Sequence, residues 1–194
     1  MVIGKSLNNS TARKDDKYST PRDLVYDIVK FMDNYWSPGD SVLDPSAGDK
    51  RFYDAFPNTL ERHYCEIDEG IDFLKHDDQV DWIVGNPPFS NARNWWRHCF
   101  KIARKGVFFI QPIHTALFRH IKESSIHGFV YDHGFKLEMF HALSVKEWFG
   151  FPVFLVFIVK DKERTIPKFK TIYHIDRNDL MSNEKHENSN WKIN

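Results

Sequence analysis

The sequence predicts one α/β domain with a mostly parallel sheet, helices on both faces and an antiparallel last strand. Short apolar segments that suit buried strands alternate with segments of helical periodicity, as in a parallel sheet with crossover helices. The last two apolar segments follow one another with little helix between them, as in an antiparallel hairpin. The length of 194 residues is that of one ordinary domain.

The first helix is predicted to begin at Thr20 as N-cap, with Pro21 in the first helical position and Asp23 completing a box-like pattern. One face of this helix is apolar at helical spacing and is expected to pack on the core. That face is formed by Leu24, Val25, Ile28, Phe31, Met32 and Tyr35. The turn at residues 37–40 is expected to end the helix.

The remaining elements follow from the same two periodicities. Strands are expected at residues 41–44, 63–67, 82–84, 106–110, 136–142 and 152–159. Helices are expected at residues 50–56, 91–103 and 113–123. Residues 18–160 are therefore predicted to form the domain, residues 1–17 a flexible N-terminal arm and residues 161–194 a polar C-terminal tail.

Composition limits the class of protein. No apolar run approaches the ~20 residues that cross a bilayer, and the polar N-terminus shows no signal peptide. The 2 cysteines, Cys65 and Cys99, do not make a disulfide framework. Neither they nor the 10 histidines show the spacing of metal ligands. We therefore expect a cytoplasmic protein without a metal. Lys plus Arg (27) equals Asp plus Glu (27), whereas strong stand-alone nucleic-acid binders usually carry a basic excess.

The sharpest motif is Asn86-Pro87-Pro88-Phe89. It follows an apolar strand, at the carboxyl edge where open α/β sheets bind ligands. The prolines fix the backbone and lack N–H donors, which leaves carbonyls facing outward. An amino group on a ring or carbonyl is a poor nucleophile because its lone pair is delocalised. The Asn86 side-chain oxygen and the Pro87 carbonyl can each accept one amino hydrogen, which aims the lone pair at an electrophilic methyl group. Phe89 offers a flat face to a planar substrate.

Two other predicted strand ends carry acidic residues. In Asp44-Pro45-Ser46-Ala47-Gly48 an acid is followed by small residues and a glycine that opens a helix. Such a turn allows close backbone approach to a ligand with amino and carboxylate groups. Glu66 follows roughly 20 residues later, the spacing of a carboxylate that binds ribose hydroxyls. From the residues alone, a solvated strand end explains Glu66 equally well.

In this order the motifs resemble those of the DNA N6-adenine methyltransferase family, in the branch whose cofactor motifs precede the catalytic loop. Tyr18-Ser19-Thr20-Pro21-Arg22-Asp23-Leu24-Val25 is similar to the family's Phe/Tyr-x-Thr-Pro-x-x-Leu-Val element, and residues 44–48 to its Asp/Glu-Pro-x-x-Gly-x-Gly loop. Glu66 lies where the family has its ribose-binding acid. Asp72-Phe73-Leu74 resembles its Asp-Phe-Leu segment, and residues 86–89 its Asn/Asp-Pro-Pro-aromatic motif.

The resemblance covers roughly residues 18–160 and implies a Rossmann-like class I methyltransferase sheet. It implies S-adenosylmethionine as cofactor and, as the reaction, site-specific methylation of the N6 amino group of an extruded adenine in DNA, as in restriction-modification systems. The implied catalytic residues are Asn86, Pro87, Pro88 and Phe89. The implied cofactor contacts are Tyr18, Thr20, Pro21, Asp44, Pro45, Ser46, Ala47, Gly48, Glu66, Asp72, Phe73 and Asn86.

Candidate DNA contacts come from one helix and one loop. Arg93, Arg97 and Lys101 share a helix face by their spacing and are candidates for phosphate binding, although a solvated face explains them equally well. Trp148, between the last two strands, is a candidate for holding the extruded base; an apolar loop under its own hairpin explains it equally well. The tail of ~30 residues is too short for a separate target-recognition domain. Either the substrate specificity is therefore loose, or short loops or a protein partner supply it.

One residue departs from the family pattern. Lys50 stands where the family has the second glycine of its cofactor loop. Its bulk keeps open the possibility of a catalytically silent partner subunit, which the intact Asn86 to Phe89 loop argues against. Methyltransferases that act on RNA bases or on protein glutamine use the same catalytic motif, so these two substrate classes also remain open.

Overall fold

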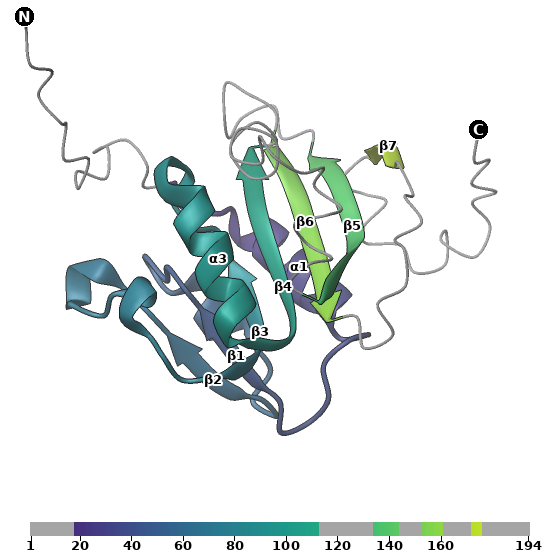
Figure 1. The fold of residues 1–194 in the computed structure, drawn as a ribbon. Helices are drawn as coiled ribbons and strands as arrows, with labels where there is room; N and C mark the ends of the chain where they lie inside the picture. Colours follow the sequence, from purple (N-terminus) through teal and green to yellow (C-terminus); the bar gives the residue numbers. More distant parts are fainter. Residues whose placement is uncertain (1–17, 113–133, 144–152, 161–171, 176–194) are drawn as a thin grey trace, which may run out of the picture.

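A computed structural model describes residues 18–112, 134–143, 153–160 and 172–175 (Figure 1). The strands form one seven-stranded sheet in the order β2-β1-β3-β4-β6-β5-β7. Their bounds are β1 Ser41–Asp44, β2 Glu61–Tyr64, β3 Val80–Gly85, β4 Ala103–Pro112, β5 Phe135–Leu143, β6 Val153–Lys160 and β7 Ile172–Ile175. The helices are α1 Arg22–Met32, α2 Arg51–Ala55 and α3 Ala92–Ile102, with single 3-10 turns η1 Ile67–Glu69, η2 Phe73–Lys75 and η3 Phe89–Asn91.

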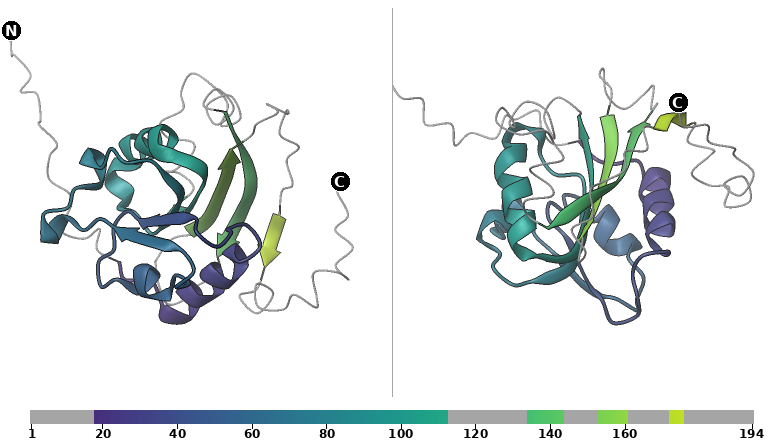
Figure 2. Two further views of the ribbon diagram at one scale, coloured as in Figure 1. Left: turned by 90° about the horizontal axis from the view of Figure 1, so that it is seen from below. Right: turned by 45° about the vertical axis from the view of Figure 1, so that its right-hand side comes forward.

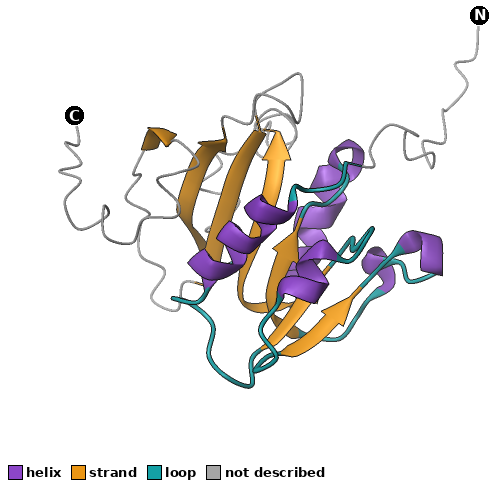
Figure 3. Cartoon of the chain, turned by 180° about the vertical axis from the view of Figure 1, so that it is seen from behind, coloured by secondary structure: helices purple, strands orange, loops and turns teal. Residues whose placement is uncertain are grey.

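The sheet is mixed in the way that the sequence predicts. Strand β6 runs antiparallel to both of its neighbours, β4 and β5, whereas the other strand pairs are parallel (Figure 3). From β1 the chain passes outward to β2 and then crosses back to β3 on the other side of β1. The strand order therefore changes direction between β1 and β3, and open α/β sheets bind their ligands beyond the carboxyl ends of the strands at such a point.

Helices cover both faces of the sheet (Figure 2). Along β4, Val107 and Phe109 belong to the core on the α3 side, whereas Phe108 and Ile110 belong to the core beneath α1 and α2. This alternation follows from the period of two along a strand. Because both sides of the strand are covered, β4 is a nearly continuous apolar run rather than an alternating one.

Several predicted boundaries need correction. Helix α1 begins at Arg22 with Pro21 as its N-cap, and no side chain caps it, so Thr20 is not the N-cap. Pro21 has an extended ψ of 136°, so helical backbone dihedrals begin only at Arg22. Strand β2 ends at Tyr64 rather than continuing to residue 67. Strand β7, within the predicted tail, pairs with β5 at the sheet edge. The helix predicted at 113–123 lies outside the described residues.

Candidate active site

The loops that follow β1 and β3 are in direct contact at the carboxyl edge of the sheet. A Cβ atom on Gly85 would lie 2.9 Å from Asp44 Oδ1 and 2.9 Å from Pro45 Cδ, so a side chain at this position would force the loops apart. Across the same junction the Ser46 hydroxyl donates to the Asn86 backbone carbonyl at 3.1 Å. The structure thus brings the predicted cofactor loop and the predicted catalytic loop together.

Asn86 has its two side-chain polar atoms in different situations. Its Nδ2 donates to the Tyr18 carbonyl oxygen at 3.1 Å. Its Oδ1 is buried and has no hydrogen-bond partner among the residues that the structure describes. A buried carbonyl without a donor costs about 1–3 kcal/mol. The amide is therefore arranged to accept a hydrogen from a ligand.

The Phe89 ring lies beside the same N-terminal segment. It stacks with the Tyr18 ring at a centroid distance of 6.1 Å and an interplanar angle of 19°. Tyr18 remains partly exposed, whereas Phe89 is buried. Pro87 is buried and Pro88 half-buried between Asn86 and Phe89. The rigid loop and the two aromatic rings form one unit.

Asp44 is a buried carboxyl group at the end of β1. Burial, together with the nearby carboxylates of Glu66 and Asp49, raises its pKa to about 7, against the opposing effect of backbone N–H donors from Ser46 and Tyr53. The Ser46 N–H lies 3.3 Å from Asp44 Oδ1. A cation bound beside Asp44 would favour its ionised form, so this position suits an ammonium group.

Glu66 and Gly48 meet across the cofactor loop. The Gly48 N–H donates to Glu66 Oε2 at 2.6 Å, and the Asp68 N–H donates to Oε1 at 3.0 Å. Gly48 has a φ of +53°, and nothing lies within 4 Å of where its Cβ would be. The backbone at Gly48 is therefore open to a ligand, with the Glu66 carboxylate beside it. Ala47 and Pro45, also predicted to contact the cofactor, are buried in this loop.

The chain after Glu66 folds into a small loop that carries an exposed apolar side chain. The Ile71 N–H donates to the Glu66 carbonyl at 3.0 Å and closes the loop. Ile67, directly after Glu66, is 64% exposed. Ile67 is predicted from the sequence to end a strand, with no functional role; its signal is an apolar residue between acids at a strand end. Its side chain offers an apolar surface next to the carboxylate.

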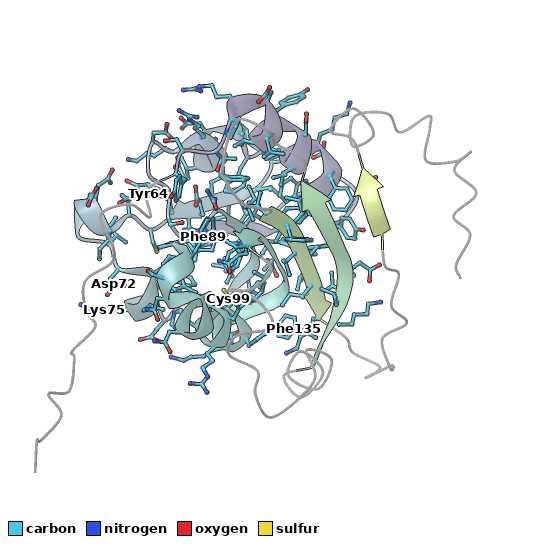
Figure 4. The ribbon with its side chains drawn as sticks, turned by 90° about the horizontal axis from the view of Figure 1, so that it is seen from above. Tyr64, Asp72, Lys75, Phe89, Cys99 and Phe135 are labelled. Carbon is cyan, nitrogen blue, oxygen red and sulfur yellow. The ribbon has the colours of Figure 1, made fainter. Side chains whose placement is uncertain are left out.

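Asp72 and its neighbour Phe73 differ in exposure. Asp72 accepts the Leu74 N–H at 3.0 Å and remains half-buried. Phe73 is 2% exposed, and its ring stacks on Trp95 of α3 at 4.6 Å. The Phe73 ring thus packs in the core, and its contact with the cofactor stays a prediction. Seen from above, Asp72, Tyr64 and Phe89 lie on the side of the molecule away from β7 (Figure 4).

The N-terminal segment is tied to the cofactor loop as well as to Asn86. The Thr20 carbonyl accepts a hydrogen bond of 2.7 Å from Arg51 Nη1. Arg51 Nε in turn pairs with Asp49 at 2.6 Å. Thr20 itself is buried and Pro21 half-buried. The structure therefore places the predicted Tyr18-to-Pro21 element against both loops.

Lys50 extends away from Gly48 toward the end of β2. Its φ of +62° is the only positive value among the non-glycine residues that the structure describes. Its Nζ lies 2.9 Å from Glu69, 3.1 Å from the Tyr64 hydroxyl and 4.3 Å from the centre of the Tyr64 ring. The ammonium group lowers the pKa of Glu69. The side chain is thus held by β2 and η1.

Two of the predicted DNA-binding side chains, those of Arg97 and Lys101, are described by the structure. Arg97 is exposed on α3, but Lys101 pairs with Asp77 at 2.6 Å, at the helix end far from the catalytic loop. The contact of Lys101 with DNA stays a prediction. The Arg93 side chain and Trp148 lie outside the described residues.

Within the described ranges, no group of three or more His, Cys, Asp or Glu residues is placed to hold a metal ion. The same part of the chain contains no helix that is both long and apolar enough to cross a membrane.

Comparison with solved structures identifies the fold. A type I restriction-modification system methyltransferase subunit from Streptococcus thermophilus aligns with a TM-score of 0.63 and 15% identity, covering 95% of this chain and 55% of that chain. The EcoKI M protein of a type I restriction enzyme aligns with a TM-score of 0.51 and 16% identity, over 81% of this chain and 47% of that chain. Magnesium protoporphyrin IX methyltransferase from Synechocystis, with bound S-adenosylmethionine, aligns with a TM-score of 0.53 and 14% identity, covering 72% of this chain and 79% of that chain.

These similarities show a class I, Rossmann-like methyltransferase fold, as the sequence predicts. The chain spans about half the length of the two restriction-modification subunits. No protein-family model matches the sequence, and the search of curated proteins gave no match.

Proposed function

We propose that the protein transfers the methyl group of S-adenosylmethionine to the N6 amino group of adenine in DNA. The observation that carries this proposal is the buried Asn86 Oδ1, which has no hydrogen-bond partner in the described part of the chain. Asn86 is the first residue after β3, and its backbone carbonyl is bonded to Ser46 in the loop after β1. An acceptor in this place suits an amino group whose nitrogen lone pair is delocalised and must be localised before the nitrogen attacks the methyl group.

The residues at the end of β1 and in the loops that follow β1 and β2 fit the cofactor. S-adenosylmethionine supplies an electrophilic methyl group on a sulfonium. Asp44 is suited to its ammonium group, because burial raises the pKa of this carboxyl to about 7 and a bound cation would restore its charge. Gly48 leaves its backbone open, and Glu66 can accept from ribose hydroxyls while it holds the Gly48 N–H. Ile67 and Asp72 would flank the adenine ring of the cofactor.

The catalytic loop would act by orienting the substrate amino group. Asn86 Oδ1 and the Pro87 carbonyl would each accept one amino hydrogen and so localise the nitrogen lone pair. Phe89, whose ring already stacks with that of Tyr18, would also contact the ring of the substrate base. After transfer the nitrogen carries a positive charge and is strongly acidic, so its proton can pass to water without a dedicated base.

Adenine in DNA is favoured over other amino substrates by the order of the motifs and by the restriction-modification subunits among the structural neighbours. A duplex target would have to be flipped out of the helix, at a cost of a few kcal/mol. Arg97, exposed on α3, together with Arg93 would contact flanking phosphates. Because one of these neighbours is itself a subunit of a restriction-modification system, we propose that a protein partner supplies sequence specificity.

The experiment that tests this function is a substrate survey with methyl-labelled S-adenosylmethionine. Purified protein is incubated separately with duplex DNA, single-stranded DNA, total RNA and a protein extract. We expect label in DNA. Label only in RNA or protein would overturn the choice of substrate, and label in no fraction, without thermal stabilisation by the cofactor, would support a catalytically silent subunit.

A further inference from the structure

Gln111, near the end of β4, is the most deeply buried polar side chain in the described structure. Its exposed fraction is 0%. Neither Oε1 nor Nε2 has a hydrogen-bond partner within the ranges that the structure covers. Removing a primary amide from water without giving it new hydrogen-bond partners destabilises the fold. An apolar side chain in this strand would avoid that destabilisation.

The pairing of β3 with β4 places Gln111 at the level of the catalytic loop. Gly85, the last residue of β3, is paired with Phe109. Gln111 therefore begins two residues beyond the end of β3, about 6.6 Å further along the strand direction. At this level β3 has already become the loop that starts with Asn86. Gln111 and the loop thus leave neighbouring strands at the same edge of the sheet.

The face that Gln111 shares is the one covered by α3 (Figure 1). Val107 and Phe109 lie in the core on that side, and Gln111 follows them with the strand period of two. Trp96 of α3 packs on Phe109 at 4.9 Å. Its indole Nε1 is likewise buried without an acceptor among the described residues. Two unpaired polar groups therefore lie on the side of the sheet where α3 continues from the catalytic loop.

We propose that Gln111 is a specificity-determining residue that binds the substrate base. This inference rests on the proposed function and deepens it. Asn86 and Pro87 would accept both amino hydrogens, which leaves the neighbouring ring nitrogen, N1 of adenine, as the acceptor on that edge. Gln111 Nε2 donates to this nitrogen. A base with an N–H at this position, such as guanine, presents a donor to a donor and is rejected.

The test uses single-stranded oligonucleotides that contain adenine, 1-deazaadenine or 3-deazaadenine at one position. Removing N1 should lower kcat/KM of the wild-type protein about tenfold or more, whereas removing N3 serves as the matched control with little effect. Gln111→Met should lower kcat/KM on adenine by a similar factor. On 1-deazaadenine the variant should lose nothing further, because the same hydrogen bond is already absent.

The structural readouts separate recognition from folding. Gln111→Met should keep the affinity for S-adenosylmethionine and should melt at the same temperature or higher, because it removes the buried unpaired amide. A wild-type protein that is indifferent to the loss of N1, or a Gln111→Met variant within twofold of wild type, would overturn the role of Gln111 while leaving the methyltransferase function intact. No transfer to any oligonucleotide by the wild-type protein would overturn both. If Gln111→Met does not fold, Gln111→Leu takes its place in the same comparison of adenine with 1-deazaadenine.

Discussion

The Asn86 side-chain nitrogen donates a hydrogen bond of 3.1 Å to the backbone carbonyl of Tyr18, a residue that lies 68 positions earlier in the chain. A carbonyl oxygen can only accept, so this contact fixes which end of the Asn86 amide faces the N-terminal segment. The opposite end, Oδ1, is thereby left as the acceptor. The N-terminal segment therefore orients the side chain that we propose to be catalytic.

Asn86→Ala should lower the rate of methyl transfer by about 10²–10³-fold, the loss typical when one preorganised hydrogen-bonding group is removed from a transition state. The affinity for S-adenosylmethionine, measured by calorimetry, should stay within about threefold. Asn86→Asp should also be impaired, because a carboxylate has no hydrogen to donate to the Tyr18 carbonyl. An Asn86→Ala protein as active as wild type would contradict the proposed role.

Tyr18→Phe should retain activity, whereas Tyr18→Ala should lower kcat. The ring that stacks on Phe89 at 6.1 Å is kept in the first variant and lost in the second. Aromatic pairs contribute about 0.5–1.5 kcal/mol beyond burial, so the loss should be roughly two- to tenfold. Comparison of single-turnover rates at saturating cofactor measures this effect. Equal rates for the two variants would show that the stack does not position the loop.

Most of the sheet could be predicted because its strands are buried apolar runs separated by turns. Residues 82–84, 106–110, 136–142 and 152–159 correspond to observed strands. Strand β7 could not be anticipated, since four residues in a polar, charged stretch carry no periodicity of their own and are paired only through β5. The start of α1 was misjudged because a threonine before a proline resembles an N-cap, although the proline itself occupies that position.

The site was predictable where residue type alone defines the chemistry. Asp44 ends β1, Asn86 directly follows β3, Glu66 lies two residues after β2, and the loops of Asn86 and Asp44 are in contact. The sequence around Phe73 does not reveal that Trp95 of α3 packs on its ring. The direction of Lys50 depends on its contacts with Glu69 and Tyr64, which no local pattern encodes. Gln111 gave no signal in the sequence, because its burial arises from the sheet pairing.

Cofactor affinity should increase with pH between about pH 5.5 and about pH 7, by up to about tenfold per unit. Burial raises the pKa of Asp44 from 3.8 to about 7, and the cofactor ammonium would bind its ionised form.

The stability of the unliganded fold should show the opposite trend. The folded state holds the Asp44 proton more tightly than the unfolded state, so the free energy of unfolding falls as pH rises from about 4 toward 7. Asp44→Asn should abolish both dependences. Calorimetric titrations and melting curves across this range measure them, and an unchanged pH profile in Asp44→Asn would exclude Asp44 as the titrating group.

Gly85→Ala should destabilise the fold by about 1–3 kcal/mol and also weaken cofactor binding. The added Cβ would lie 2.9 Å from both Asp44 Oδ1 and Pro45 Cδ and would push the two loops apart. Gly106→Ala is the matched control, because its Cβ would lie 2.6 Å from the Ile158 carbonyl, away from both loops. Denaturant unfolding should show a loss for both variants, whereas only Gly85→Ala should change cofactor affinity. Equal cofactor affinities would indicate that the loop junction does not shape the site.

Lys50→Gly should leave cofactor affinity within about threefold of wild type. Glycine adopts the φ of +62° without strain, and the side chain that is lost contacts Glu69 and Tyr64 rather than the open backbone at Gly48. Glu69→Gln, which removes the ion pair but keeps the lysine, is the control for stability. A gain of tenfold or more in the affinity of Lys50→Gly would show instead that the lysine obstructs the cofactor.

The central claim is most directly tested by identifying the methylated product. DNA incubated with the protein and methyl-labelled S-adenosylmethionine is digested to nucleosides, which are separated and analysed by mass spectrometry, with Asn86→Ala treated in parallel. We predict labelled N6-methyldeoxyadenosine from the wild-type protein and none above background from the variant. Label on another nucleoside, no label in DNA, or equal label from Asn86→Ala would contradict the proposed function.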